Sequence, residues 1–382
     1  MTTAGTESSA AGTSRYGRTR LWLGISGVGF FVTLATIALA AGVPGQLAAL
    51  ETTGTRRVLM LLGFFGIYAV LHLPFDLLGG YLLPKRHGRS HPPLGVYLFG
   101  LLRAVALQGL WMTTALVLMT YLAAWGMQSG TIIGGIGASV AVSAGIVVFL
   151  LALRGRMADL YAPLDFAGGR QTETGRDVIE VESDDEGFTG GVTGLFKTQH
   201  VLPEHWKQQL GDDGFELAIR RREAAFTTGS FRRGRIVAIV FTLLGVTISA
   251  LLAGPLLGTA AGTIELALWF TLWSFLGLLT LPTLSRRGVM EVDRAVGADV
   301  SENTRKLDQL QDDEPRRPGV VETIFHPIPS VENRLANTTP VTGAWDANRT
   351  AVYLSLAGGG LLGRAVHCNS GRPALWAFLP VE

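Results

Sequence analysis

Six long apolar runs dominate the pattern of hydrophobic and polar positions along the chain. Each is close to or longer than the roughly 20 residues that a helix needs to cross about 30 Å of hydrocarbon. A spanning segment must also satisfy its own backbone hydrogen bonds, which a helix does. The pattern therefore predicts a polytopic membrane protein with about six spans, near Leu21 to Val43, Val58 to Leu83, Tyr97 to Met127, Thr131 to Leu153, Ile236 to Leu257 and Ile264 to Leu284.

The polar stretches divide the rest of the chain. Residues 1–20 form a basic tail that is expected to be disordered, because it has little to bury. Four spans lie within 21–153 and two within 236–284, and the polar regions 154–235 and 285–382 follow these two groups.

Local patterns predict structure in both polar regions. Apolar and polar residues alternate from Asp177 to Glu182, as in a strand, and apolar residues recur near a helical period between 213 and 228. A further helix is expected to continue from the sixth span to about Leu310. The fold class predicted is mainly α, with a small α+β domain beside the membrane helices.

Composition and charge agree with a membrane protein. Charged residues make up 16% of the chain and hydrophobic residues 48%, whereas about 25% of a soluble domain is charged. The net charge of +2 is spread over the flanks, so no nucleic-acid partner is expected and the lipid bilayer is. Cations follow the second, fourth and sixth spans and precede the first, whereas Arg56 and Arg57 before the second span are an exception. The balance predicts that both termini are cytoplasmic, in a plasma or inner membrane.

Three short motifs carry a family resemblance. Arg222-Glu223-Ala224-Ala225-Phe226 precedes the fifth span, Ser285-Arg286-Arg287-Gly288-Val289-Met290-Glu291-Val292-Asp293 follows the sixth, and His326-Pro327 comes later with Arg334 behind it. In this order and spacing the chain resembles the integral membrane zinc metallopeptidases of the CAAX prenyl protease 1 and HtpX-like type. Those proteins carry HExxH, SRxxExxAD-like and HPxxxxR-like segments at these places. The resemblance is firmest between residues 162 and 334.

The resemblance implies a degenerate site. In HExxH two histidines bind zinc and the glutamate activates a water. The three ligand positions fall on Arg222, Phe226 and Val289, none of which suits zinc. The catalytic set that remains is Glu223 at the general-base position, with Asp293, His326 and Arg334. The expected function is that of a pseudopeptidase without metal, which binds or regulates membrane proteins or peptides.

Two alternatives stay open for the site. Arg222 could stand where the metal was and neutralise Glu223 or Asp293, or it could belong to a solvated helix face. A relocated zinc site could also make the protein an active membrane metalloendopeptidase, with ligands from His200, His205, His326 or His367.

Polar residues at membrane depth suggest one more function. His72 and Asp76 lie one turn apart in the second span, and Arg103 lies in the third. Charges in hydrocarbon are costly and usually face a partner, so an Asp76–Arg103 pair is expected. The same residues could serve a transporter or channel.

The last thirty residues lie beyond the resemblance. Gly358 to Gly363 matches GxGxxG, but no strand–helix–strand unit surrounds it, so dinucleotide binding is not expected. A folded C-terminal cap is the prediction for this segment.

Overall fold

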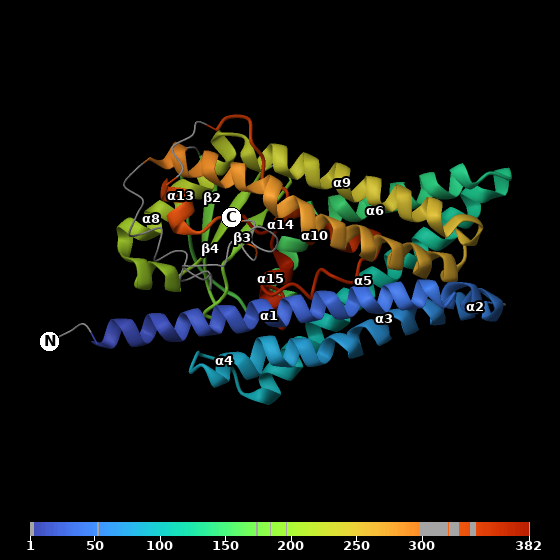
Figure 1. Ribbon diagram of the computed structural model, residues 1–382, viewed down its shortest axis with the longest axis horizontal. Helices are drawn as coiled ribbons and strands as arrows, with labels where there is room; N and C mark the ends of the chain where they lie inside the picture. Colours follow the sequence, from blue (N-terminus) through green and yellow to red (C-terminus); the bar gives the residue numbers. More distant parts are fainter. Residues whose placement is uncertain are drawn as a thin grey trace.

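Six helices in the described part of the chain are long and apolar enough to cross a membrane, within Arg15–Ala40, Gly54–Arg86, Leu94–Ser129, Ile132–Ala152, Ser230–Leu256 and Ala260–Val296. The computed structural model describes residues 4–51, 53–172, 175–183, 185–195, 197–297, 320, 328–336 and 341–381. The six predicted spans are therefore confirmed, and the protein is an integral, multi-pass membrane protein of mainly α class (Figure 1).

The N-terminal half consists of long helices joined by short turns. Helix α1 begins at Ala4 and so includes most of residues 1–20, where the sequence predicts a disordered tail; extending an existing helix costs less than nucleating one. The elements are α1 (Ala4–Ala40), α2 (Val43–Leu50), α3 (Gly54–Leu77), the π-helical turn η1 (Leu78–Leu82), α4 (Leu83–Arg86), α5 (Leu94–Gly126), η2 (Met127–Ser129), α6 (Ile132–Ala152), η3 (Arg154–Met157) and α7 (Ala158–Tyr161).

A small sheet lies at one end of the helix bundle, beside α8 (Figure 1). Its strands are β1 (Asp165–Gln171), β2 (Asp177–Glu182), β3 (Gly191–Thr193) and β4 (Gln199–Pro203), in the order β1-β2-β4-β3. Strands β2 and β4 are parallel, and the outer pairs are antiparallel. The strand predicted at 177–182 is confirmed.

Helix α8 (His205–Thr227) contains the helix predicted at 213–228. It starts earlier than expected and is interrupted at Gly211, whose φ of 71° and ψ of 175° are not helical. Helices α9 (Ser230–Ala253), η4 (Gly254–Leu256) and α10 (Ala260–Val296) follow. Helix α10 continues past the sixth span and ends at Val296, because Gly297 has a non-helical φ of 94° and ψ of 173°; the helix predicted to run unbroken to Leu310 is therefore wrong at Gly297. Residues 298–310 lie outside the described residues, as does His326.

The C-terminal chain enters the bundle, turns and leaves it again. Its elements are α13 (Val331–Ala336), α14 (Asn348–Leu354), η5 (Ser355–Gly358) and α15 (Pro373–Ala377). The Asn348 amide donates to Ser285 Oγ at 3.1 Å and the Leu361 amide to Thr271 Oγ1 at 3.1 Å. These two α10 residues are roughly 21 Å apart along the helix axis. We call residues 348–379 the C-terminal hairpin.

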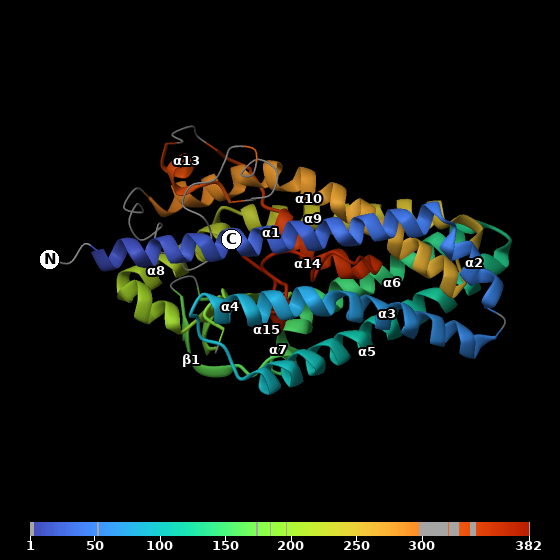
Figure 2. The same ribbon diagram turned by 60° about the horizontal axis from the view of Figure 1, so that its bottom comes forward.

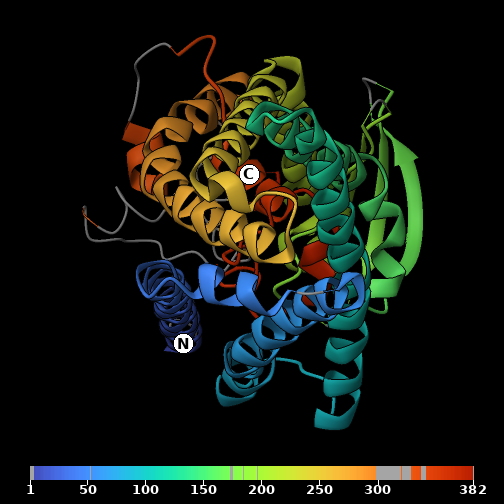
Figure 3. The ribbon, with the colours of Figure 1, turned by 90° about the vertical axis from the view of Figure 1, so that its right-hand side faces the viewer.

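In Figure 3 the C-terminal hairpin lies inside the bundle, between α9 and α10 on one side and α1 and α3 on the other. It returns to the sheet, where Leu379 and Val192 of β3 exchange backbone hydrogen bonds of 2.8 and 3.2 Å. Irregular backbone at membrane depth is tolerated only where protein or water-filled space surrounds it. The predicted cap is thus a re-entrant segment that fills the centre of the bundle.

Intramembrane polar residues hold the C-terminal hairpin. The Arg364 guanidinium forms a buried ion pair with Asp76, whose Oδ1 also accepts from the Gly371 amide at 2.9 Å. His72 Nε2 lies 3.3 Å from the Leu361 carbonyl oxygen. The expected Asp76–Arg103 pair is wrong: Arg103 is exposed and donates to the Asp159 carbonyl at 3.1 Å. The sequence could not show that a cation from the tail returns to this depth.

Candidate functional site

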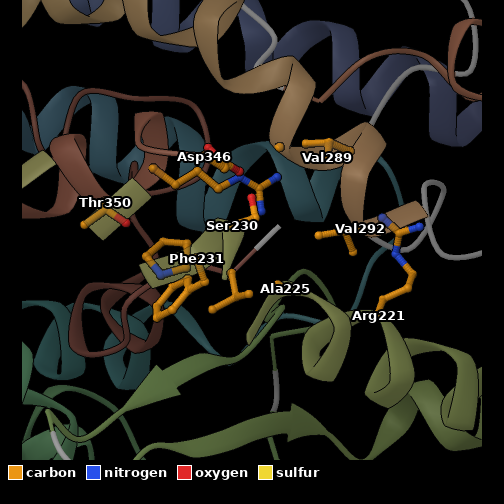
Figure 4. Close-up of a pocket in the computed structure, with 12 residues that line it drawn as sticks. Arg221, Ala225, Ser230, Phe231, Val289, Val292, Asp346 and Thr350 are labelled. Atoms are coloured by element: carbon orange, nitrogen blue, oxygen red, sulfur yellow. The ribbon is translucent and has the colours of Figure 1, made fainter. Parts of the chain in front are cut away.

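A small cavity lies between α8 and α10, at the end of the bundle that carries the sheet (Figure 4). Its volume is about 30 Å³, which leaves room for no more than a few water molecules. Helix α8 contributes Arg221 and Ala225 to the lining, and α10 contributes Val289 and Val292. Helix α9 and the C-terminal hairpin close it, through residues that include Phe231 and Thr350.

The residues of α8 that share a cavity with Val289 each lie one position before the ligand positions of the sequence motif. Residues four apart share one face of a helix, and the pair on this face is Arg221 and Ala225. Phe226 instead packs its ring against those of His200 and Phe231, with centroids 5.1 and 4.6 Å away. The structure therefore does not bring Arg222 and Phe226 to Val289.

Arg222 is directed toward the sheet. Its guanidinium donates to the carbonyl oxygens of Thr189, Gly191 and Val201 at 2.7, 3.2 and 2.6 Å. The side chain is 3% exposed, so the solvated helix face is wrong, and the idea that Arg222 replaces a metal beside Asp293 is wrong as well. Arg222 connects α8 to the start of β3 and the middle of β4.

Glu223 is held by two partners from the sheet side. His200 Nε2 lies 2.8 Å from its Oε1, and Arg176 Nη1 donates to its Oε2 at 2.6 Å. Burial, and next the Arg222 guanidinium, lower the pKa of His200 to about 4, against the opposing effect of the Glu223 carboxylate. A neutral imidazole donating to Glu223 fits these contacts, and with Arg176 it leaves this carboxylate engaged in structural bonds.

Asp293 is engaged by two arginines. Arg334 of α13 donates to both of its oxygens, through Nε at 2.7 Å and Nη2 at 2.8 Å, and Arg221 forms a second ion pair with it. The structure thus brings together Asp293 and Arg334, two of the residues singled out from the sequence. It adds Arg221, which sequence reasoning missed because the three consecutive arginines gave no sign of which one faces α10.

The arrangement of these elements occurs in a solved structure. The crystal structure of Ste24p from S. mikatae superimposes with a TM-score of 0.60, covering 80% of this chain and 80% of that one at 10% sequence identity. This chain has the fold of Ste24p. No known sequence family and no curated protein matches the sequence. The Ste24p likeness confirms the metallopeptidase-like fold that the short motifs predicted, and at 10% identity it concerns the fold alone.

A Ste24p-like fold implies zinc between α8 and α10, and the residues there do not fit it. Catalytic zinc takes about three protein ligands from His, Cys, Asp or Glu. Among the described lining residues Asp346 alone is of these types, and α8 and α10 present Arg221, Ala225 and Val289. A guanidinium has no lone pair to donate and carries a charge that repels the ion.

The relocated-metal alternative finds no assembled site in the described residues, among which no three His, Cys, Asp or Glu side chains lie close enough to hold a metal ion. His200 lies on β4 against Glu223, and His205 begins α8. His367 lies in the bundle, where a Cβ added to Gly24 of α1 would come within 2.5 Å of its amide nitrogen.

Proposed function

We propose that this protein is a noncatalytic member of the metallopeptidase-like fold, which binds or regulates membrane proteins or peptides and uses no metal. The observation that carries the proposal is the lining of the α8–α10 cavity. Arg221 and Ala225 of α8 and Val289 of α10 line this cavity, and Arg221 forms an ion pair with Asp293. Hydrolysis on this fold would need a metal-activated water, and this donor set supports none.

Peptide binding is supported by the path of the C-terminal hairpin. A peptide can add to an exposed strand edge through backbone hydrogen bonds, and the chain's own Leu379 does this at β3. We propose that client segments of membrane proteins compete with Leu379 for this edge, which Leu379 occupies in the folded chain. We further propose that both termini are cytoplasmic, in a plasma or inner membrane, because the basic flanks gather at one end of the spans.

The first experiment measures zinc by mass spectrometry, and hydrolysis of a fluorogenic peptide panel, on full-length purified protein. We expect zinc far below one per chain and no cleavage that a chelator abolishes. One zinc per chain, together with chelator-sensitive cleavage, would overturn the proposal in favour of an active metalloendopeptidase.

A second experiment introduces zinc ligands into α8 and α10 and tests which positions of this chain correspond to the zinc ligands of the metallopeptidases. We expect the triple variant R221H/A225H/V289E to bind about one zinc per chain, since the three side chains share one cavity. The matched control, R222H/F226H/V289E, follows the sequence motif and is expected to bind none. Zinc in the control alone would show that the ligand positions are those of the motif.

A further inference from the structure

A second and larger cavity, of about 320 Å³, lies between α1, α10 and the C-terminal hairpin. Its walls are mainly apolar, with Ile25 and Val28 on α1 and Phe275 and Leu278 on α10. In Figure 2 α1 passes in front of the C-terminal segment, and α10 lies above α1. The site is separate from the residues that surround Val289, except that Arg349 and Pro380 border both cavities.

Polarity changes along the cavity. Arg349 is placed at the sheet end, because the neighbouring Asn348 and Ala347 amides donate to Ser285 Oγ at 3.1 and 3.0 Å. Arg349 is partly buried and has no hydrogen bond or ion pair with the described residues. The apolar part extends from Leu21 to Gly29 along α1, roughly 12 Å at the rise of a helix.

The ionisable side chains that line the cavity favour a ligand with a negatively charged group. Arg349 and His367 are the ionisable nitrogen groups among the described lining residues, which include no carboxylate. An unpaired guanidinium at the end of an apolar cavity favours an anion, which it can bind through charge-assisted hydrogen bonds.

The cavity opens between α1 and α10 toward the space that lipid occupies. Gly29, which lines it, is exposed, and so is Leu279, with 39% of its surface accessible. A ligand can therefore enter sideways from the bilayer. The volume lies near the lower limit of roughly 300 Å³ for ligand sites, which suits one acyl chain better than two.

We propose that this cavity binds an anionic amphiphile with a single acyl chain, a fatty acid or a lysophosphatidate. The chain lies between α1 and α10 and the carboxylate or phosphate binds Arg349, with His367 beside it. This orientation matches a lipid in the leaflet on the sheet side, because Arg349 lies at that end of the bundle and the apolar walls lie deeper. The proposal does not depend on the absence of peptidase activity.

The test uses full-length protein in phosphatidylcholine nanodiscs and cis-parinaric acid, a fluorescent fatty acid, with empty nanodiscs as background. We expect saturable binding to the protein and binding at least about tenfold weaker in Arg349→Gln, which removes the cation. The uncharged methyl ester is expected to bind wild type and Arg349→Gln alike. Equal affinity of wild type for the acid and its ester would overturn the anionic head group.

Glycine variants test the place of the acyl chain. An added Cβ meets nothing within 4 Å at Gly29 in the cavity wall or at Gly63 on α3, so both Gly29→Phe and Gly63→Phe are expected to fold with melting temperatures near that of wild type. We expect Gly29→Phe to abolish saturable binding and Gly63→Phe to retain it. Unchanged binding in Gly29→Phe would overturn the site.

The single cysteine gives an independent readout, because Cys368 lines this cavity and its side chain has accessible surface there. Bound fatty acid is expected to slow its alkylation by N-ethylmaleimide severalfold, and lysophosphatidate used in place of the acid distinguishes phosphate from carboxylate. Protection by either supports the proposal and identifies the head group. Alkylation that is equally fast with and without both would contradict it.

Discussion

Buried charges show most directly how single residues organise this protein. Arg364 and Asp76 are 2% and 0% exposed, and the ion pair joins the C-terminal hairpin to α3. Removing one partner of a buried pair leaves an uncompensated charge, which costs far more than the pair contributes when intact. The pair therefore provides a sharp test of where the hairpin lies.

We predict that Asp76→Asn lowers the free energy of unfolding by about 3–5 kcal/mol. The matched control Arg103→Gln is expected to change it by less than about 0.5 kcal/mol, as for an exposed side chain. Thermal unfolding in detergent, followed by tryptophan fluorescence, measures both. An equal loss in the two variants would mean that Asp76 pairs with Arg103 after all.

His200 predicts a dependence of stability on pH. Its pKa is about 4 in the fold and about 6.5 when unfolded, so between these values the unfolded chain binds a proton that the fold does not. Stability is therefore complete above pH 6.5 and falls by up to about 3 kcal/mol as the pH drops toward 4.

Melting temperatures measured from pH 7.5 to pH 5 are expected to fall less steeply in His200→Gln than in wild type. His91→Gln, which removes a partly exposed histidine, is the control and should keep the wild-type slope. Parallel curves for wild type and His200→Gln would show that His200 is not buried in its neutral form.

At the scale of elements, glycines decide how closely the C-terminal hairpin approaches its neighbours. A Cβ at Gly24 of α1 would lie 2.5 Å from the His367 amide nitrogen, whereas one at Gly66 of α3 would meet nothing within 4 Å. Gly24 thus serves close packing of α1 against the backbone of the C-terminal hairpin.

Gly24→Ala and Gly66→Ala are expected to have opposite effects. Alanine is favoured over glycine in a helix by about 1 kcal/mol, so Gly66→Ala should raise the unfolding free energy slightly. Gly24→Ala should lower it by about 1–3 kcal/mol, because the hairpin must move. If the unfolding midpoint rises in both variants, the hairpin does not pack on α1 as described.

At the scale of the whole molecule, the sheet and the basic flanks share one end of the bundle, and this predicts the topology. In a Cys368→Ser background, cysteines at the exposed positions Ser90 and Ser129 would mark the two ends. In intact cells an impermeant maleimide is expected to label Ser129→Cys and not Ser90→Cys. The reverse pattern would place the sheet outside the cell.

The sequence by itself determined the six spans, the strand at 177–182 and the helix before the fifth span, because each depends on a local period of hydrophobic residues. It also indicated the metallopeptidase-like fold, since the order of short motifs survives when ligands are replaced. These features can be predicted without knowing which distant residues contact one another in the fold.

Only the tertiary structure decided which face a helix turns toward its neighbours, and which residues far apart in the sequence come into contact. It placed Arg221 and Ala225, one residue before the motif positions, opposite Val289, because the sheet draws Arg222 to the other side of α8. It also gave Asp76 a partner from the far end of the chain, Arg364. Local periodicity cannot contain such contacts, because they arise only when the C-terminal hairpin folds back into the bundle.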